Sequence, residues 1–184
     1  MAQFPFPDPP LVDEIIRLRP WSQNDADAAH DATQDALIPR FTRVPENQTK
    51  EDIRRFIDGR EPARQSGNVL PLVIANTRSD ELLGTISLMG LEWEQRRGGI
   101  GFWLAPEARG HSVATRAVRL LSRWALTELG LARVQLGTYT DNYASQRVAE
   151  RCGFVREGVL RSFLEIKGHR HDLVMFSLLP GDLG

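Results

Sequence analysis

The stretch IGFWLAPEARGHSVATRA, which spans Ile100 to Ala117, decides how this chain folds. An apolar run typical of a strand leads into a turn that contains Gly110, and the turn leads directly into an amphipathic helix. The first N–H groups of a helix have no acceptor within it and lie at the positive end of the helix dipole. We therefore expect an anion cradle here, and a phosphate or pyrophosphate suits such a cradle best.

The helix after this turn has a periodic apolar face. Apolar residues recur at the three- and four-residue spacing of one buried face. They are Val113, Ala117, Leu120, Leu121 and Trp124. The opposite face carries Arg116, Arg119 and Arg123, and Gly130 ends the helix. On this pattern alone, an ordinary strand-to-helix connection without a ligand remains an alternative.

A second strand and helix follow at once. The strand is indicated by alternation at Val134, Leu136 and Thr138. The helix is indicated by Ala144, Val148 and Cys152, which fall four residues apart. We expect Asn142 to cap the helix at its start and Gly153 to end it.

This order of elements resembles the GNAT superfamily of acyl-CoA-dependent N-acyltransferases, and within it the RimJ/RimL-like branch, from about Ile16 to Leu179. The likeness is carried together by IRLRPW at Ile16 to Trp21, GFWLAP at Gly101 to Pro106, DNYAS at Asp141 to Ser145 and CGFVREG at Cys152 to Gly158. It implies an α/β (α+β) fold with a mixed, mostly antiparallel sheet flanked by helices. The sheet is expected to splay between the Gly101–Leu104 and Val134–Tyr139 strands, with pantetheine in the splay.

The resemblance also implies where the donor binds. The family's pyrophosphate turn is matched by Arg109 and Ala114, but Ser112 stands where a glycine is expected. A serine in a left-handed conformation costs roughly 1–2 kcal/mol, so we expect weakened or altered CoA binding. The expected CoA-binding residues are Trp103, Leu104, Ala105, Arg109, Gly110, His111, Ser112, Val113, Ala114, Thr115, Asn142, Ser145 and Arg147.

The implied reaction is direct attack of an amine on a thioester. By resemblance, a backbone N–H near Leu104 would stabilise the carbonyl oxyanion. In many family members a tyrosine protonates the departing CoA thiolate, but this chain has Ala149 at that position. The RimJ/RimL-like branch has instead a serine in the first turn of the same helix, and Ser145 matches it. Ser145 and Asn142 are otherwise explained as first-turn capping residues.

The general base is not determined by the sequence. The family often has a glutamate just before the GFWL-like run, where this chain has Gly98 and Gly99. Glu92, Glu94 and Glu165 are the candidates, each of which is otherwise a solvated surface carboxylate. A further alternative is that no strong base exists and that the amine arrives neutral.

Other reactive residues have plainer explanations. His169 and His171, with Asp172, have the spacing of a metal site on one strand face, but no third clustered ligand supports it. We expect no metal there and favour a turn or acceptor-pocket role. Cys152 lies on the apolar face at a helix C-terminus, where the dipole disfavours a thiolate, so we expect it to pack rather than react.

The first half of the chain is expected to shape the acceptor side. Residues 16–21 would form the first strand, and residues 69–75 and 82–91 would form two consecutive strands. Ser22 with Asp25 and Thr49 with Asp52 have the spacing of capping boxes. The proline-broken segment LIPRFTRVPENQ, residues 37–48, lies between them. By resemblance, this segment would help to form the acceptor pocket.

Composition fits one enzyme-sized domain over residues 15–180, with a flexible lead-in at 1–14 and a loose tail at 181–184. The chain has 184 residues, 41% of them hydrophobic, and a formal net charge of −1. Nothing in this charge favours a nucleic acid or membrane partner. One cysteine excludes an internal disulfide and is compatible with the cytoplasm, and the proline-rich start does not resemble a signal peptide.

We therefore expect an N-acetyltransferase that moves an acetyl or larger acyl group from acyl-CoA, with acetyl-CoA as the default, to a primary amine. The acceptor classes are a protein N-terminus, an amino sugar or another small amine, and a homodimer is an expected assembly. The alternative is a non-catalytic acyl-CoA-binding or sensing protein, motivated by the departures at Gly99, Ser112 and Ala149. A Rossmann module is disfavoured because no G-x-G-x-x-G follows an early strand.

Overall fold

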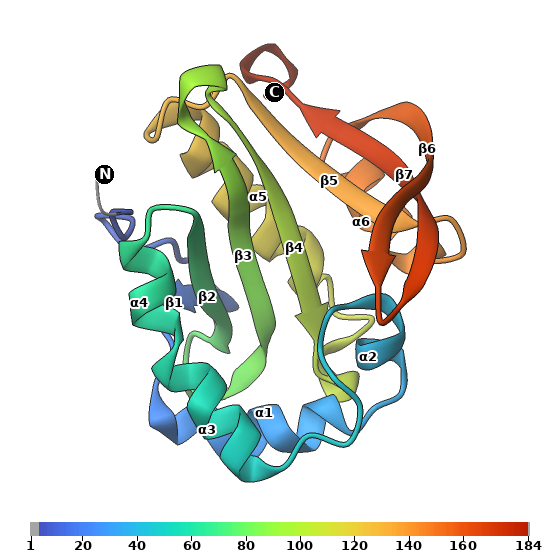
Figure 1. The fold of residues 1–184 in the computed structure, drawn as a ribbon. Helices are drawn as coiled ribbons and strands as arrows, with labels where there is room; N and C mark the ends of the chain where they lie inside the picture. The colour runs from blue at the N-terminus through green and yellow to red at the C-terminus, as the bar shows by residue number, and fades with distance from the viewer. Residues whose placement is uncertain (1–3, 184) are drawn as a thin grey trace.

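The protein is built on one seven-stranded sheet with strand order β1-β2-β3-β4-β5-β7-β6 (Figure 1). The structure is a computed structural model that describes residues 4–183. Its strands are β1 (Ile16–Arg19), β2 (Val69–Asn76), β3 (Leu82–Glu92), β4 (Arg97–Leu104), β5 (Arg133–Tyr139), β6 (Val155–Ile166) and β7 (His169–Leu178). All neighbouring strands are antiparallel except β4 and β5, which are parallel. The mixed, mostly antiparallel sheet is therefore confirmed.

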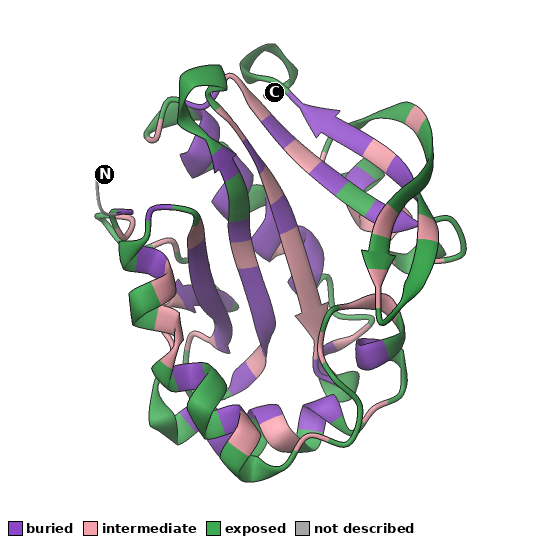
Figure 2. Cartoon of the chain, viewed as in Figure 1, coloured by how far each residue is buried: buried purple, intermediate pink, exposed green. Residues whose placement is uncertain are grey.

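Helices cover both faces of this sheet. They are α1 (Ala26–Thr33), α2 (Leu37–Phe41), α3 (Lys50–Asp58), α4 (Arg60–Gln65), α5 (Val113–Thr127) and α6 (Tyr143–Arg151). The helices α5 and α6 lie behind the sheet in Figure 1. Strand alternation sends Leu72 and Ile74 into the core with α5, and sends Val73 and Ala75 into a smaller core with α1 and α3. Figure 2 shows that burial concentrates on the central strands, whereas β6 is mostly exposed.

The capping signals fix the helix starts as the sequence predicts. Both expected capping boxes form, Ser22 with Asp25 and Thr49 with Asp52. Asn142 caps α6, since its side-chain oxygen accepts a hydrogen bond from the Ser145 N–H at 3.2 Å. These bonds satisfy N–H groups that a helix start leaves without partners.

Several element boundaries differ from the expectation. β1 ends at Arg19, because Pro20 has no N–H to donate to a strand partner. β4 begins at Arg97, four residues before the expected strand, because its two glycines hide the strand pattern. The α6 face is also shifted, since Ala144 is exposed and Ala149 is fully buried.

Phe4 and Leu183, near the two ends of the described residues, pack in or against the main core. Phe4 is fully buried in the main core, and its carbonyl accepts a hydrogen bond from the Arg64 guanidinium. Phe4, in the expected flexible lead-in, is therefore packed, whereas residues 5–14 are exposed or half-buried. A short 3-10 turn spans Pro180–Asp182, whereas Gly184 lies outside the described residues. Across residues 4–183, none of the helices combines the length and apolar character needed to cross a membrane.

Candidate active site

The site is a gap that opens between the two parallel strands. β4 and β5 pair only where Arg97 to Gly99 meets Arg133 to Gln135, and the later residues of both strands have separated (Figure 1). The expected splay is therefore present, with its closed end at Arg97 and its open end at Leu104 and Tyr139. Because the strands are parallel, the helices that follow them, α5 and α6, both begin at the open end.

The N–H of Leu104 points into this splay. Backbone groups of successive strand residues point to opposite sides, and the Ala105 N–H donates to Leu83 of β3 at 2.9 Å. The N–H and carbonyl of Leu104 therefore point away from β3, toward β5. This is the direction that the expected oxyanion donor requires.

The facing edge of β5 is supplied by Gly137, which the sequence analysis missed. The odd-numbered residues of β5 direct their backbone groups toward β4, because the Arg133 N–H donates to the Arg96 carbonyl at 3.3 Å beside the β4–β5 pairing. Gly137 is exposed and lies beyond the last paired residue. A free strand edge at this glycine can pair with an extended amide chain such as pantetheine. Strand alternation combined with the splay would have identified it.

The turn before α5 forms an open cradle. Gly110 has φ +82° and Ser112 has φ +61°, and both are left-handed. Ser112 therefore takes the costly conformation that the sequence analysis considered. A Cβ added at Gly110 would meet no atom within 4 Å, so space is open above the turn. α5 begins without a side-chain cap, which leaves its first N–H groups available to an anion.

Arg109 does not extend from this turn as a free cation. Its guanidinium donates to the Asp35 carboxylate at 2.8 Å and to the Leu104 carbonyl at 3.1 Å. The same bond is the main cause that lowers the pKa of Asp35. Arg109 thus ties the α1–α2 connection to the end of β4, while its own side-chain charge is partly neutralised.

The start of α6 presents a hydroxyl and a free arginine. Ser145 is half-buried in the first turn, and no hydrogen bond to its hydroxyl occurs among residues 4–183. Arg147 is exposed and forms no ion pair with a described residue. Ala149 lies in the core, so its position, where many family members carry a tyrosine acid, faces away from the site.

The remaining residues expected to bind CoA differ in whether their side chains are exposed. Val113, Ala114 and Thr115 have buried side chains, so they can offer only backbone groups to a ligand. His111 is exposed on the turn, and Ala105 is buried beside α2. Trp103 lies on the opposite sheet face from α5, where its side chain packs with residues of α1, α2 and α3.

Two of the three candidate bases, Glu92 and Glu94, lie at the closed end of the splay. Glu92 forms a two-pronged ion pair with Arg97 at the closed end, which lowers its pKa, and Glu94 lies in the adjacent hairpin turn. Seven residues separate Arg97 from Leu104, roughly 23 Å along a strand. Glu92 and Glu94 are therefore poorly placed for an amine near Leu104.

Glu165 lies nearer the open end but points away from it. The β6–β7 hairpin reaches α2, where Lys167 Nζ donates to the Pro39 carbonyl at 2.6 Å. Glu165 pairs with Arg170 across the hairpin, whereas His171 pairs with Leu164. Since cross-strand partners share a face, Glu165 lies on the opposite face from His171. No candidate carboxylate is thus held at the opening.

The two histidines and the cysteine have structural neighbours. The His171 ring packs against Tyr139 at a centroid distance of 4.6 Å with the ring planes tilted by 33°, on the acceptor side of the sheet. Within residues 4–183, no cluster of three or more potential metal ligands occurs. The Cys152 thiol contacts the Thr115 carbonyl at 3.4 Å, and burial raises its pKa to about 11, so it is a packing residue.

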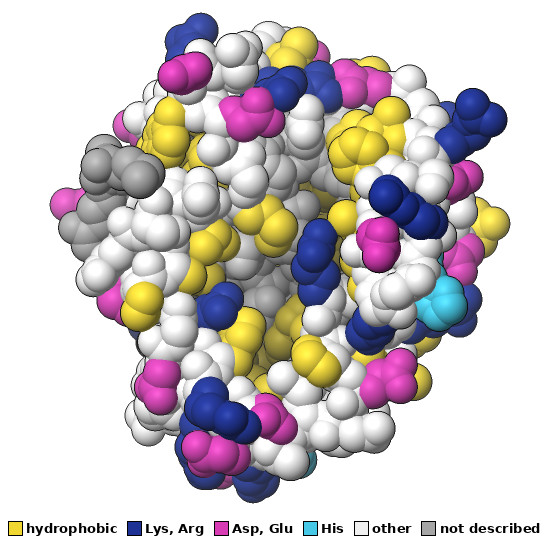
Figure 3. All heavy atoms as spheres, viewed as in Figure 1, with side chains coloured by type: hydrophobic (Ala, Val, Ile, Leu, Met, Phe, Trp, Pro, Cys, Tyr) yellow, Lys and Arg dark blue, Asp and Glu magenta, His cyan; other side chains and the backbone are white. Residues whose placement is uncertain are grey.

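A pocket on the face opposite α5 is lined in part by Trp103, the residue before Leu104. This inner pocket has a volume of about 210 Å³, and three aromatic side chains dominate its wall. It is lined by Trp21, Ala29, Thr33, Arg43, Val44, Pro45, Gln48, Ile53, Phe56 and Trp103. Figure 3 shows a hollow on this face with hydrophobic side chains inside it and basic side chains beside it. Because Trp103 precedes Leu104 in the chain, the pocket lies beside the oxyanion donor.

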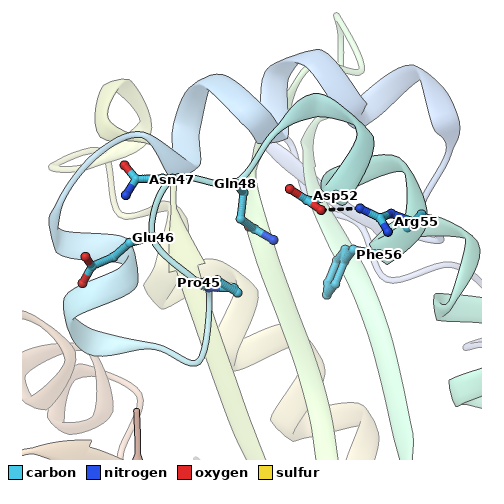
Figure 4. A pocket seen from close by; sticks show the side chains of 7 residues that line it. All are labelled: Pro45, Glu46, Asn47, Gln48, Asp52, Arg55 and Phe56. Atoms are coloured by element: carbon cyan, nitrogen blue, oxygen red, sulfur yellow. Dashed lines mark hydrogen bonds and ion pairs between the residues drawn. The ribbon is translucent and has the colours of Figure 1, made fainter.

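A shallower depression lies outside the inner pocket. It is lined by Pro45, Glu46, Asn47, Gln48, Asp52, Arg55 and Phe56 (Figure 4). In Figure 4 the Asp52 carboxylate and the Arg55 guanidinium are paired. Pro45, Gln48 and Phe56 line both spaces, so they separate the inner pocket from this depression.

Comparison with known proteins identifies the family of the chain. Residues 16–155 match the model for an acetyltransferase (GNAT) domain. The chain belongs to the GNAT acetyltransferase family. It is 31% identical over 152 residues to the ribosomal-protein-serine acetyltransferase of Escherichia coli, covering 83% of this chain and 75% of that protein.

Two further relatives agree with this GNAT assignment. A stretch of 98 residues is 43% identical to the Bacillus subtilis protein named "Putative ribosomal N-acetyltransferase YdaF", and spans 53% of this chain and only 54% of that protein. The structure of Mycobacterium smegmatis RimJ in complex with CoA-disulfide superposes with a TM-score of 0.84 at 22% identity, covering 95% of this chain and 87% of that one. The GNAT fold and the RimJ/RimL-like branch are confirmed. The chain is an acyl-CoA-dependent acetyltransferase.

Proposed function

We propose that this GNAT enzyme transfers an acetyl group from acetyl-CoA to the N-terminal amine of a protein or peptide by direct attack. The observation that carries the proposal is the Leu104 N–H directed into the splay, at the end where α5 and α6 both begin. The names of the Escherichia coli and Bacillus subtilis relatives support a ribosomal protein as acceptor. Amino sugars and other small amines remain the alternative acceptor classes.

The donor fits the residues that are present. The open turn at Gly110 and the uncapped start of α5 can receive the pyrophosphate, and Gly137 can pair with a pantetheine amide. The polar residues at the start of α6, Asn142 and Ser145, complete this side, with Arg147 available to the nucleotide end. The buried residues Val113, Ala114 and Thr115 would contribute backbone N–H groups only.

The chemistry then divides between backbone and hydroxyl groups. The amine attacks the thioester carbonyl, and the developing oxyanion accepts a hydrogen bond from the Leu104 N–H. The Ser145 hydroxyl donates a proton to the departing thiolate at a helix start, where the dipole also stabilises negative charge. The attacking nitrogen becomes positively charged when the new bond forms, and it gives up one proton that returns to the Ser145 oxygen through water, so the products are the N-acetyl amine and the CoA thiol. Because none of Glu92, Glu94 and Glu165 is held at the opening, we propose that the amine enters in its neutral form.

Assembly and location are also proposals. The edge strand β6 exposes the apolar side chains of Val155, Val159 and Phe163, which supports a homodimer through this edge. We place the enzyme in the cytoplasm, since its single cysteine forms no disulfide.

Measurement of thiol release tests the catalytic proposal. The purified enzyme is mixed with acetyl-CoA and a panel of amine acceptors, and Ser145→Ala is compared with Ser79→Ala, which removes an exposed hydroxyl in the β2–β3 turn. Loss of a general acid lowers kcat by about 10² or more, whereas binding of acetyl-CoA stays nearly unchanged. Full turnover in Ser145→Ala would contradict the role of Ser145. Binding of acetyl-CoA without turnover by the wild type would favour a non-catalytic sensor.

A further inference from the structure

The buried hydroxyl of Tyr139 has no partner. Tyr139 ends β5 at the open end of the splay, and only 8% of its surface is exposed. Its ring lies between Phe41 of α2, at a centroid distance of 5.9 Å, and His171 of β7. The hydroxyl is buried, yet it forms no hydrogen bond. A buried donor without an acceptor is costly, so such a group in an enzyme site indicates a ligand that completes it.

An exposed arginine lies near both Tyr139 and the inner pocket. Arg43 forms no hydrogen bond or ion pair with any residue from 4 to 183, although it lines the inner pocket. Burial is the main cause that raises the pKa of Tyr139, while the positive charge of Arg43 lowers it and the negative charge of Asp141 raises it. Arg43 lines the inner pocket and lies two residues after Phe41, whose ring contacts Tyr139, so one ligand can reach both groups.

The segment that holds Arg43 crosses the open end of the splay. Phe41 contacts Tyr139 of β5, and Val44 packs with Trp103 of β4. Arg43 lies between these two contacts and therefore lies above the place where an amine approaches the thioester. Among the residues that line the inner pocket, Arg43 is the sole charged one. A polycationic acceptor would meet this positive charge at the pocket wall, and the Asp141 carboxylate near Tyr139 is already paired with Arg40 at 2.8 Å.

We infer that Arg43 and Tyr139 select an acceptor that carries a carboxylate close to its amine, with an apolar group held against Trp21, Phe56 and Trp103. A guanidinium and a hydroxyl can both donate to one carboxylate, and such charge-assisted hydrogen bonds are stronger than neutral ones. This inference rests on the proposed function and defines its substrate class. A protein N-terminus with an early acidic residue has this chemistry.

Three peptide amides with the same N-terminal amine test the inference. They are Ser-Glu-Phe-amide, Ser-Gln-Phe-amide and Ser-Lys-Phe-amide, and the measurement is kcat/KM with acetyl-CoA. We expect kcat/KM for the glutamate peptide to be about tenfold or more above that for the glutamine peptide, because only the glutamate peptide forms a hydrogen bond through a charged group. The lysine peptide should have the lowest kcat/KM. Arg43→Gln should reduce the ratio of the first two to about one, and Arg43→Glu should favour the lysine peptide.

Matched variants separate selectivity from structure. Arg78→Gln removes the same charge from the exposed β2–β3 turn and should keep the wild-type preference. Tyr139→Phe removes the hydroxyl alone and should lower the preference for the acidic peptide without weakening binding of acetyl-CoA. Equal turnover of the three peptides by the wild type overturns this inference and leaves the proposed function intact.

Two other outcomes also decide the matter. If Arg43→Gln weakens acetyl-CoA binding but keeps the preference for the acidic peptide, Arg43 binds acetyl-CoA rather than the acceptor and the inference is wrong. If the wild type binds acetyl-CoA but acetylates none of the three peptides, the proposed N-terminal acceptor and this inference both fail. A preference for the acidic peptide that Arg43→Gln abolishes supports both.

Discussion

Tyr139→Phe should stabilise the protein. The wild-type hydroxyl is buried without a hydrogen bond, whereas the ring contacts with Phe41 and His171 do not require it. Leaving a buried polar group unsatisfied costs about 1–3 kcal/mol, and phenylalanine removes that cost with little change in shape. For a domain of this size, each kcal/mol shifts Tm by about 2–4 °C. The expected gain in Tm is therefore roughly 2–12 °C.

Thermal and urea unfolding followed by circular dichroism measure this gain. Tyr143→Phe is the matched control, because Tyr143 is 64% exposed and its hydroxyl can bond to water; its stability should change by less than about 0.5 kcal/mol. Burial also raises the pKa of Tyr139 above its usual value of 10.0. As pH rises, the tyrosine therefore ionises in the unfolded protein at a lower pH than in the folded protein. Above pH 10.0 the wild type should lose further stability relative to Tyr139→Phe. A less stable Tyr139→Phe would refute the reasoning, because it would show that the hydroxyl has a partner.

Three further predictions concern the donor turn and the sheet. Ser112→Gly should stabilise the left-handed turn by about 1 kcal/mol and tighten CoA binding, as measured by unfolding and calorimetric titration. Asp35→Asn should release the charge of Arg109 and give tighter CoA binding with a steeper salt dependence; unchanged affinity would show that the guanidinium stays in place. A hydrogen bond from Arg133 is the main cause that lowers the pKa of Glu157 to about 2. The ionised Glu157 carboxylate therefore stabilises the folded protein, and this contribution should be lost as pH falls from about 4.5 toward 2. Acid unfolding should show that loss in the wild type and not in Glu157→Gln.

The sequence predicted those parts of the site that depend on local geometry. The strand, turn and helix around Gly110 have short-range signals, and so do the caps at Ser22, Thr49 and Asn142. Each signal is a bond or a conformation within a few residues, so a single sequence contains it in full. The packing of the half-buried Cys152 against the core followed in the same way from its place on a helix.

What the sequence missed depends on pairing across the sheet. Gly137 gains its exposed edge only because β4 separates from β5 after Gly99. The choice of Ala149 over Ala144 as the buried residue depends on how α6 is rotated against the sheet. Glu92 and Glu165 were reasonable bases by proximity in sequence, but strand direction and face place both away from the opening. None of these facts is visible in a local pattern.

The CoA site uses mainly backbone groups, whereas the acceptor site uses side chains. The family's CoA site can therefore form despite changes in sequence, but the acceptor cannot be predicted from the sequence alone. Leu104, Gly137 and the first turn of α5 offer backbone groups, so their side chains vary without changing the donors. Ser112 adopts the conformation that a glycine would take, so the cradle forms although the serine strains the turn. The acceptor side is built instead from side chains, above all Arg43, that meet Tyr139 and Trp103 only in the folded chain. Specificity therefore has to be argued from three-dimensional contacts, and those contacts favour an acidic acceptor.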